Sequence, residues 1–323
     1  MSIMILKKLL YGMMGVALLS SCYDEDALTP GDRVIESRFE FPQGNDEWDK
    51  DLQDIYDEFG IYVIYKNYTE DDFDRSWNGG GGGAQAHYSG LDVKEEHVVD
   101  AINFIKDHIF SYLNRDVVQQ ALPPYLYLSY DLAARMELMP GYITKSGPNI
   151  SFSGMDYWAI GWGRILEYAG GLVQIEQDPP STAAVFRSYR GEFMQVLLRR
   201  AVERGNIVMP TGFGRNFDYK TQVVTGAPNE GDPNYYMTRG FPGTMGFIGF
   251  SLSALSSISG MNPQECFICY LHMCLFYTKE QFDTQFAAKF RVLAETRQQV
   301  VDYMKDTYKI DLEAIAQGPE IVQ

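Results

Sequence analysis

The sequence predicts an α-rich α+β protein with a single folded domain. Three observations lead to this fold class: long segments carry apolar residues at helical spacing, shorter apolar runs are bounded by proline or glycine, and no internal repeat is visible. Residues 45–323 are enough to build one domain with its own apolar core.

Apolar spacing and capping residues place the helices. The first begins near Asn45 and ends at Gly60, since glycine suits a helix C-terminal cap. Asp92 with Glu95 three residues later indicates a capping box that opens a helix through Leu113. Three further helices are expected, from Pro179-Pro180 to about Glu203, from Asn262 with Pro263 in its first turn, and from about Lys279 to Met304.

Strands and loops fill the intervals between the helices. Strands are expected at residues 61–65, 125–130 and 150–153. The run Gly79–Gly83 is a flexible loop and no phosphate-binding loop, because no Gly-Lys-Ser/Thr follows it. Residues 205–246 are rich in Gly, Pro, Asn and Asp and predict a long irregular excursion.

The N-terminus predicts export. Lys7 and Lys8 precede an apolar run that is too short to span a bilayer, so residues 1–21 are expected to be a signal peptide. Leu18-Leu19-Ser20-Ser21 followed by Cys22 resembles the bacterial lipoprotein box, which implies acylation (palmitate and related chains) of Cys22. The alternative is an ordinary signal peptide with an incidental cysteine. Residues 22–44 are then a lipidated tether, and residues 45–323 are the domain.

The charge and the residues after Cys22 bear on location and partners. The chain has 43 acidic against 27 basic residues and a formal net charge of −16, so we expect no nucleic-acid partner. The acidic cluster Asp24-Glu25-Asp26 resembles the surface-export signal of lipoproteins in bacteria that use Sus-like (starch-utilisation-type) nutrient importers. This resemblance implies an outer-membrane lipoprotein that faces the cell exterior.

No common catalytic motif is visible in the residues alone. The four histidines His87, His97, His108 and His272 form no His-Glu-x-x-His motif, and neither a Ser/His/Asp motif nor a Rossmann glycine pattern occurs.

One helix nevertheless resembles a known family. Residues 189–197, Tyr-Arg-Gly-Glu-Phe-Met-Gln-Val-Leu, are similar to the His-Glu-Phe-x-His-x-Leu helix of a zinc-binding metallopeptidase family of lipoproteins, often encoded beside Sus-like importers. The resemblance extends over most of the chain and implies a zincin-like metallopeptidase fold. The other segments that carry it are 47–56, 61–65, 123–130, 262–270, 300–303 and 310–312.

The resemblance also implies that this copy has lost its metal. In the family, two histidines four residues apart hold zinc, and the glutamate between them activates the bound water. The ligand positions are Gly191 and Gln195 here, and only Glu192, at the general-base position, is kept. Two alternatives stay open. Glu192 and Gln195 could lie on a solvated helix face with Gly191 as a packing accommodation, or an active zinc metallopeptidase could take its ligands from His87, His97 or His108.

A second candidate metal site lies in the helix after Asn262. Cys266, Cys269 and His272 fall roughly along one side of it, with Cys274 close by, and the residue types could bind zinc. The helix is apolar all round, so core packing of these thiols is the main interpretation. Glu265 is expected to complete a capping box with Asn262.

Taken together, the sequence predicts a non-catalytic metallopeptidase-like lipoprotein with no cofactor. We expect it to be an accessory subunit that contacts SusC/SusD-like importer subunits during uptake of a glycan or peptide nutrient. The alternatives are an active zinc metallopeptidase and a glycan-binding surface lipoprotein. The last would use exposed aromatic rings, although Trp158 and Trp162 are expected to lie mainly in the core.

Overall fold

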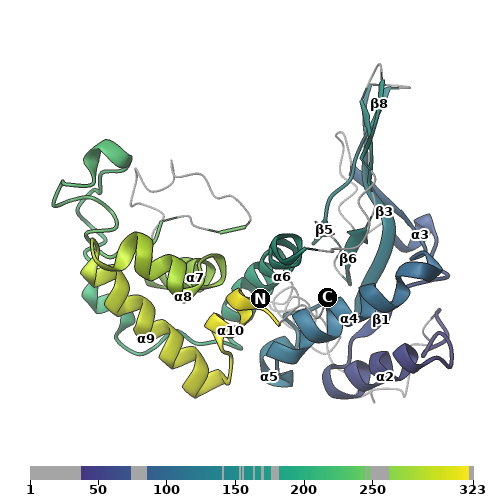
Figure 1. Ribbon diagram of the computed structural model, residues 1–323, viewed down its shortest axis with the longest axis horizontal. Helices are drawn as coiled ribbons and strands as arrows, with labels where there is room; N and C mark the ends of the chain where they lie inside the picture. Colours follow the sequence, from purple (N-terminus) through teal and green to yellow (C-terminus); the bar gives the residue numbers. More distant parts are fainter. Residues whose placement is uncertain are drawn as a thin grey trace, which may run out of the picture. The chain divides into compact units, whose positions relative to one another are not determined.

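The computed structural model describes most of the chain from Arg38 onward (Figure 1). The described ranges are 38–73, 86–139, 142–152, 154, 156–162, 164–168, 171–175, 182–243, 246–247 and 262–319. The predicted signal peptide, Cys22, most of the tether, Gly79–Gly83 and Pro179-Pro180 lie outside these ranges. Contacts divide the chain after Glu40, and all elements below belong to the unit Phe41–Gln323.

The first helix, α2 (Glu47–Phe59), confirms its prediction. Asp46 and Asp49 form a capping box at its start, and Gly60 ends it in the left-handed conformation at φ 73°. Its buried face includes Leu52, Ile55 and Phe59 and packs against α4 (Val98–His108).

The start and end of α4 correct the sequence prediction. Asp92 caps no helix: a 3-10 turn, Glu95–His97, comes first, and α4 ends at His108 instead of continuing to Leu113. The backbone N–H of Val93 donates to the carbonyl of Tyr65, so residue 93 is held against the end of β1 (Tyr62–Ile64) and the helix starts later.

The sheet is organised around one long strand, β3 (Tyr125–Met139). The first half of β3 lies parallel to β1 on one side and to β6 on the other, and its second half is antiparallel to β2 and β4. The predicted strand at 125–130 is therefore confirmed but continues well beyond Tyr130. The remaining strands are β2 (Ala86–Leu91), β4 (Tyr142–Ser146), β5 (Ile150–Ser151), β6 (Tyr157–Trp162), β7 (Arg164–Tyr168) and β8 (Gly171–Ile175).

The C-terminal part of the described chain is helical. Helix α6 (Ala183–Arg204) and helix α7 (Pro263–Phe276) confirm two predictions, and the excursion between them contains only short turns where it is described. The single helix expected from Lys279 to Met304 is wrong. It divides into α8 (Lys279–Phe282), a π-helical turn (Asp283–Ala287) and α9 (Arg291–Tyr308), because Phe290 leaves helical geometry and buries its ring. Helix α10 (Leu312–Gln317) follows.

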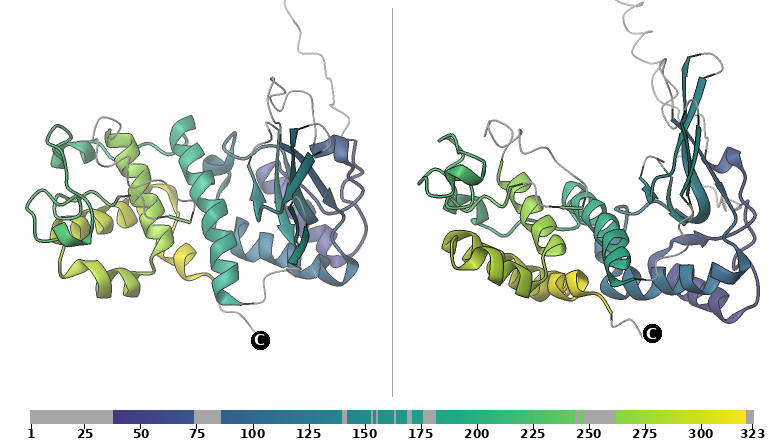
Figure 2. Two further views of the ribbon diagram at one scale, coloured as in Figure 1. Left: turned by 90° about the horizontal axis from the view of Figure 1, so that it is seen from above. Right: turned by 45° about the horizontal axis from the view of Figure 1, so that its top comes forward.

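Helix α6 is central to the core. It contacts α7 and α10 as well as α4, the short helix α5 (Arg115–Val118) and β5, and both views in Figure 2 show α10 beside it. The mixture of helices with a mixed parallel and antiparallel sheet confirms the α+β class. Among the described residues, no helix is long and apolar enough to cross a membrane.

Candidate functional site

The helix that resembles a metal-binding helix is the buried α6. Thr182 caps its start by accepting the N–H of Val185, and Gly205 ends it at φ 84°. Helix α6 is packed on several sides, so polar residues in its middle turns, such as Arg190 and Gln195, are buried against neighbouring elements. The surroundings of these buried positions can be compared with a metal site.

Gly191 and Gln195 face the segment Gly246–Phe247. A Cβ added to Gly191 would lie under 3.0 Å from three atoms of the Phe247 ring, which is closer than real Cβ atoms approach. One turn later, the side-chain Oε1 of Gln195 accepts the backbone N–H of Phe247 at 2.8 Å. Gln195 is only 1% exposed, so the alternative of a solvated helix face is wrong for this residue. For Gly191, the packing interpretation is confirmed.

Glu192 lies beside these two positions and is half-buried. The hydroxyl of Ser188 donates to its Oε1 at 3.3 Å. A carboxylate held by a neutral hydroxyl on its own helix can accept protons, but hydrolysis would also need a polarised water near it.

The residues at the two ligand positions do not fit a zinc ion. Gly191 offers no donor atom and has no room for a larger side chain, while the amide oxygen of Gln195 is engaged by a backbone N–H. Among the described residues, no group of three or more His, Cys, Asp or Glu side chains is arranged to hold a metal.

Two arginines on α6 bind the carboxyl ends of other helices. Arg187 donates to the carbonyl of Phe276 at the end of α7 and to Oε1 of Gln281 at 2.9 Å. Arg190 donates to the carbonyls of Ile315 at 2.6 Å and Ala316 at 3.3 Å, near the end of α10. A cation at a helix C-terminus is favoured by the helix dipole, so these contacts fix α7 and α10 on α6.

Arg190 also explains the environment of His108. Its guanidinium lies 2.8 Å from Nδ1 of His108, which must accept the hydrogen bond and therefore be neutral. Burial, followed by the charge of Arg190, lowers the pKa of His108 to about 4. Burial also lowers the pKa of Arg190 to about 10. Residues two apart on a helix point to nearly opposite sides, so His108 lies across α6 from Glu192.

The other two histidines considered as alternative ligands are also placed. His97 ends the 3-10 turn before α4, and His87 lies in β2 opposite Arg135 of β3.

The second candidate metal site forms part of the core. Cys266, Cys269 and Cys274 are buried free thiols. His272 is 3% exposed, and its Nε2 donates to the carbonyl of Gln195 at 3.2 Å. Burial raises the pKa of Cys269 to about 12, and burial followed by the charge of Arg199 lowers the pKa of His272 to about 3. These are properties of packed, uncharged groups.

Glu265 differs from its predicted role. Asn262 caps α7 through the N–H of Glu265, as expected, but the carboxylate of Glu265 does not complete a capping box. Instead it binds Arg199 of α6 through two bonds, of 3.0 Å and 2.6 Å. This bidentate pair joins α6 to α7. Local capping rules could not predict it, because Arg199 lies on a different helix, far away in the sequence.

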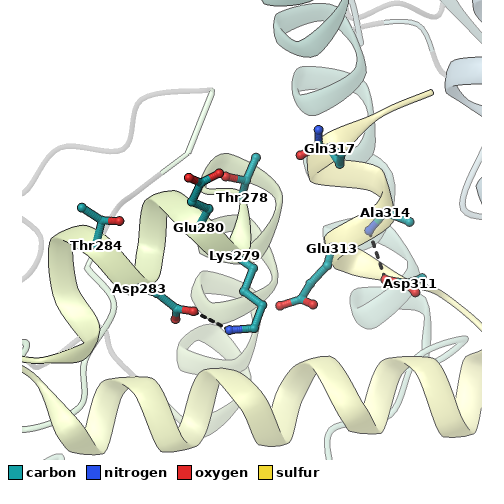
Figure 3. Close-up of a pocket in the computed structure, with 9 residues that line it drawn as sticks. All are labelled: Thr278, Lys279, Glu280, Asp283, Thr284, Asp311, Glu313, Ala314 and Gln317. Carbon is teal, nitrogen blue, oxygen red and sulfur yellow. Dashed lines mark hydrogen bonds and ion pairs between the residues drawn. The ribbon is translucent and has the colours of Figure 1, made fainter. Parts of the chain in front are cut away.

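A groove of about 670 Å³ lies between α8 and α10 and contains none of the predicted site residues (Figure 3). Three of the four carboxylates that line it take part in ion pairs. Asp283 pairs with Lys279, Asp311 with Lys305, and Glu313 with the buried Arg297. The full lining is Thr278, Lys279, Glu280, Asp283, Thr284, Asp311, Glu313, Ala314 and Gln317.

The comparisons with known proteins give one likeness in structure. No protein-family profile and no curated protein matches the chain. The fold is similar to the crystal structure of a candidate zinc-binding metallo-peptidase from Bacteroides caccae, with 12% sequence identity and a TM-score of 0.42. The match covers 85% of this chain and 92% of that one.

Sequence reasoning missed two residues that organise the site. Phe247 comes directly after the predicted irregular excursion 205–246, and nothing in its neighbourhood indicated that it would contact Gly191. Arg190 lies within the quoted motif but at a position that the family resemblance leaves open. The available signal was its spacing from Phe186 and Phe193, which puts an arginine on the apolar side of the helix.

Trp158 and Trp162 are core residues, as expected. Trp158 and Trp162 lie in β6 and are 0% and 1% exposed, and Trp158 packs edge-on against Phe193 of α6. They offer no platform for a sugar ring.

Proposed function

We propose that this protein is an outer-membrane surface lipoprotein with a zincin-like metallopeptidase fold that does not catalyse. It would act as an accessory subunit of a Sus-like nutrient-uptake complex. The observation that carries the proposal is the pairing of Gly191 and Gln195 with Gly246–Phe247. The two positions that resemble metal ligands contact the protein's own chain instead.

Support for the location comes from the sequence. The lipoprotein box at Cys22 and the acidic residues that follow it are the basis for a lipid anchor and for exposure at the cell surface. The formal net charge of −16 keeps such a domain soluble and away from anionic lipid head groups.

The absence of catalysis is tested by peptide hydrolysis. The chain from residue 23 onward contains the whole unit Phe41–Gln323 and can be assayed without its lipid. We expect the parent chain and Glu192→Gln to leave a mixed peptide library equally uncut. Hydrolysis by the parent that is lost in Glu192→Gln would refute the proposal and establish the enzyme.

The accessory role is tested by affinity capture from membranes. A tagged full chain should co-purify with SusC/SusD-like subunits, and Cys22→Ser should be released from the membrane and lose them. Capture of the full chain without any importer subunit would contradict the accessory role.

Glycan binding is a second candidate, favoured by one aromatic cluster. The half-buried rings of Phe41, Tyr56, Tyr62 and Tyr125 form a continuous patch where α2 meets β1 and β3. Ring centroids are 4.5 Å apart for Tyr56–Tyr62 and 5.4 Å apart for Tyr62–Tyr125. Partly exposed rings of this kind can stack on the apolar face of a sugar. Calorimetry against oligosaccharides, with Tyr56→Ala as the variant, tests it: heat that persists in the variant would exclude the patch.

A further inference from the structure

Three small or polar positions fit together around Phe247. On α6, Gly191 leaves bare backbone under the ring and Gln195 accepts the N–H of Phe247 at 2.8 Å. On the facing segment, a Cβ at Gly246 would lie only 2.7 Å from Nε2 of Gln195, so residue 246 must also be small. The ring of Phe247 then packs at 5.1 Å from the ring of Phe276 at the end of α7.

From this arrangement we infer that α6 carries a binding site for a short peptide unit, a glycine followed by an aromatic residue, and that Gly246–Phe247 occupies it within the same chain. The buried amide oxygen of Gln195 accepts the N–H of the peptide, and the aromatic ring packs on the bare backbone at Gly191, which we call the seat. The inference goes beyond the proposed function, because it depends only on contacts within the unit Phe41–Gln323.

The seat is held in place independently of its occupant. Gln195 is 1% exposed, and its backbone carbonyl accepts a hydrogen bond from His272 of α7 at 3.2 Å. Arg187, one turn before Gly191, donates to the carbonyl of Phe276, the last residue of α7. The two helices that form the seat are therefore joined on both sides of it. Removing the Phe247 ring should leave the place of the ring open, because helices tied by buried polar contacts relax little. The backbone N–H of an alanine at position 247 still reaches Gln195, but without the ring a peptide that brings its own aromatic ring can displace it.

A double-mutant cycle tests the contact between Gly191 and the Phe247 ring within the chain. Gly191→Ala should lower the melting temperature of the chain from residue 23 onward by about 2–5 °C, because the new methyl group displaces the ring. In a Phe247→Ala background the same change should raise it by about 1–3 °C, since alanine then only improves helix propensity. Phe247→Leu is the second background, and Gly231→Ala, with nothing within 4 Å of its added Cβ, is the control. An equal loss in all backgrounds would overturn the inference.

Binding of a separate peptide to the Phe247→Ala chain tests whether the site recognises a glycine followed by an aromatic residue. N-acetyl-glycyl-phenylalanine amide should show saturation transfer from the Phe247→Ala chain and none from the parent chain, whose site is occupied. N-acetyl-glycyl-alanine amide is the control ligand. The transfer should disappear in Phe247→Ala combined with Gly191→Ala. No transfer from the Phe247→Ala chain, or equal transfer from both chains, would overturn the proposed site.

Discussion

Replacing Arg190 by alanine is the perturbation whose effect follows most directly from the structure. The side chain is 2% exposed, and its guanidinium makes three hydrogen bonds, to the carbonyls of Ile315 and Ala316 and to Nδ1 of His108. In the part of the chain that the structure describes, helix-end carbonyls and a neutral imidazole, rather than a carboxylate, face this charge.

These contacts set the size of the expected loss in the free energy of unfolding. A hydrogen bond from a charged donor contributes about 1.5–3 kcal/mol, so three amount to about 4.5–9 kcal/mol before correction. Removing the guanidinium also relieves its desolvation, which recovers several kcal/mol, but the carbonyls of α10 lose their partner. We expect a net loss of about 3–5 kcal/mol in the free energy of unfolding.

Urea denaturation of the chain from residue 23 onward is the assay. A loss of this size should lower the midpoint by about 1–2 M. The matched control is Arg291→Ala, since Arg291 is an exposed arginine that pairs with Glu295 of its own helix α9, and the midpoint of this variant should not change. The reasoning is refuted if Arg190→Ala and Arg291→Ala unfold at the same urea concentration as the parent.

Three further predictions follow from the buried polar groups. First, burial lowers the folded-state pKa of His108 to about 4 and that of His272 to about 3, below the ordinary histidine value of 6.5. Below about pH 6.5 the unfolded chain therefore binds more protons than the folded chain. Stability measured by urea titration should therefore fall from about pH 6.5 towards pH 4, more steeply in the parent than in His108→Asn, and a flat profile would contradict it. Second, burial raises the pKa of Cys274 to about 11 and holds that of Cys266 well above its usual range. Iodoacetamide at pH 8 should leave Cys266, Cys269 and Cys274 unmodified until denaturant is added, whereas fast labelling of the native chain would show exposed thiols. Third, Glu265→Ala should cost about 1–2 kcal/mol by leaving Arg199 without its bidentate partner, while Glu280→Ala, on the exposed rim of the groove, serves as the control in the same denaturation series.

The sequence predicts elements well where the signal is local. Apolar spacing and the caps at Gly60 and Asn262 located α2 and the start of α7, because capping depends on residues three or four apart. Prediction failed where a contact with a residue far away in the sequence determines where a helix begins or ends. Phe290 breaks the expected last helix to bury its ring, and Val93 is held by Tyr65 before α4 can begin.

The candidate site shows the same division. The positions Gly191, Glu192 and Gln195 were found from a nine-residue pattern, and their spacing on one helix followed directly. Their surroundings could not be predicted, because Phe247 is separated from Gln195 by 52 positions and no periodicity connects them. Burial of Gln195 likewise depends on α7 and on the Gly246–Phe247 segment, and therefore on the tertiary fold.

The central claim is that Gly191 and Gln195 of α6 hold a segment of the protein's own chain and no zinc ion. Its most direct test is the zinc content of the chain from residue 23 onward, measured by mass spectrometry after equilibration with zinc and dialysis. We expect the parent chain to retain no zinc in excess of that retained by Gln195→Ala. One zinc per chain in the parent, lost in Gln195→Ala, would contradict it.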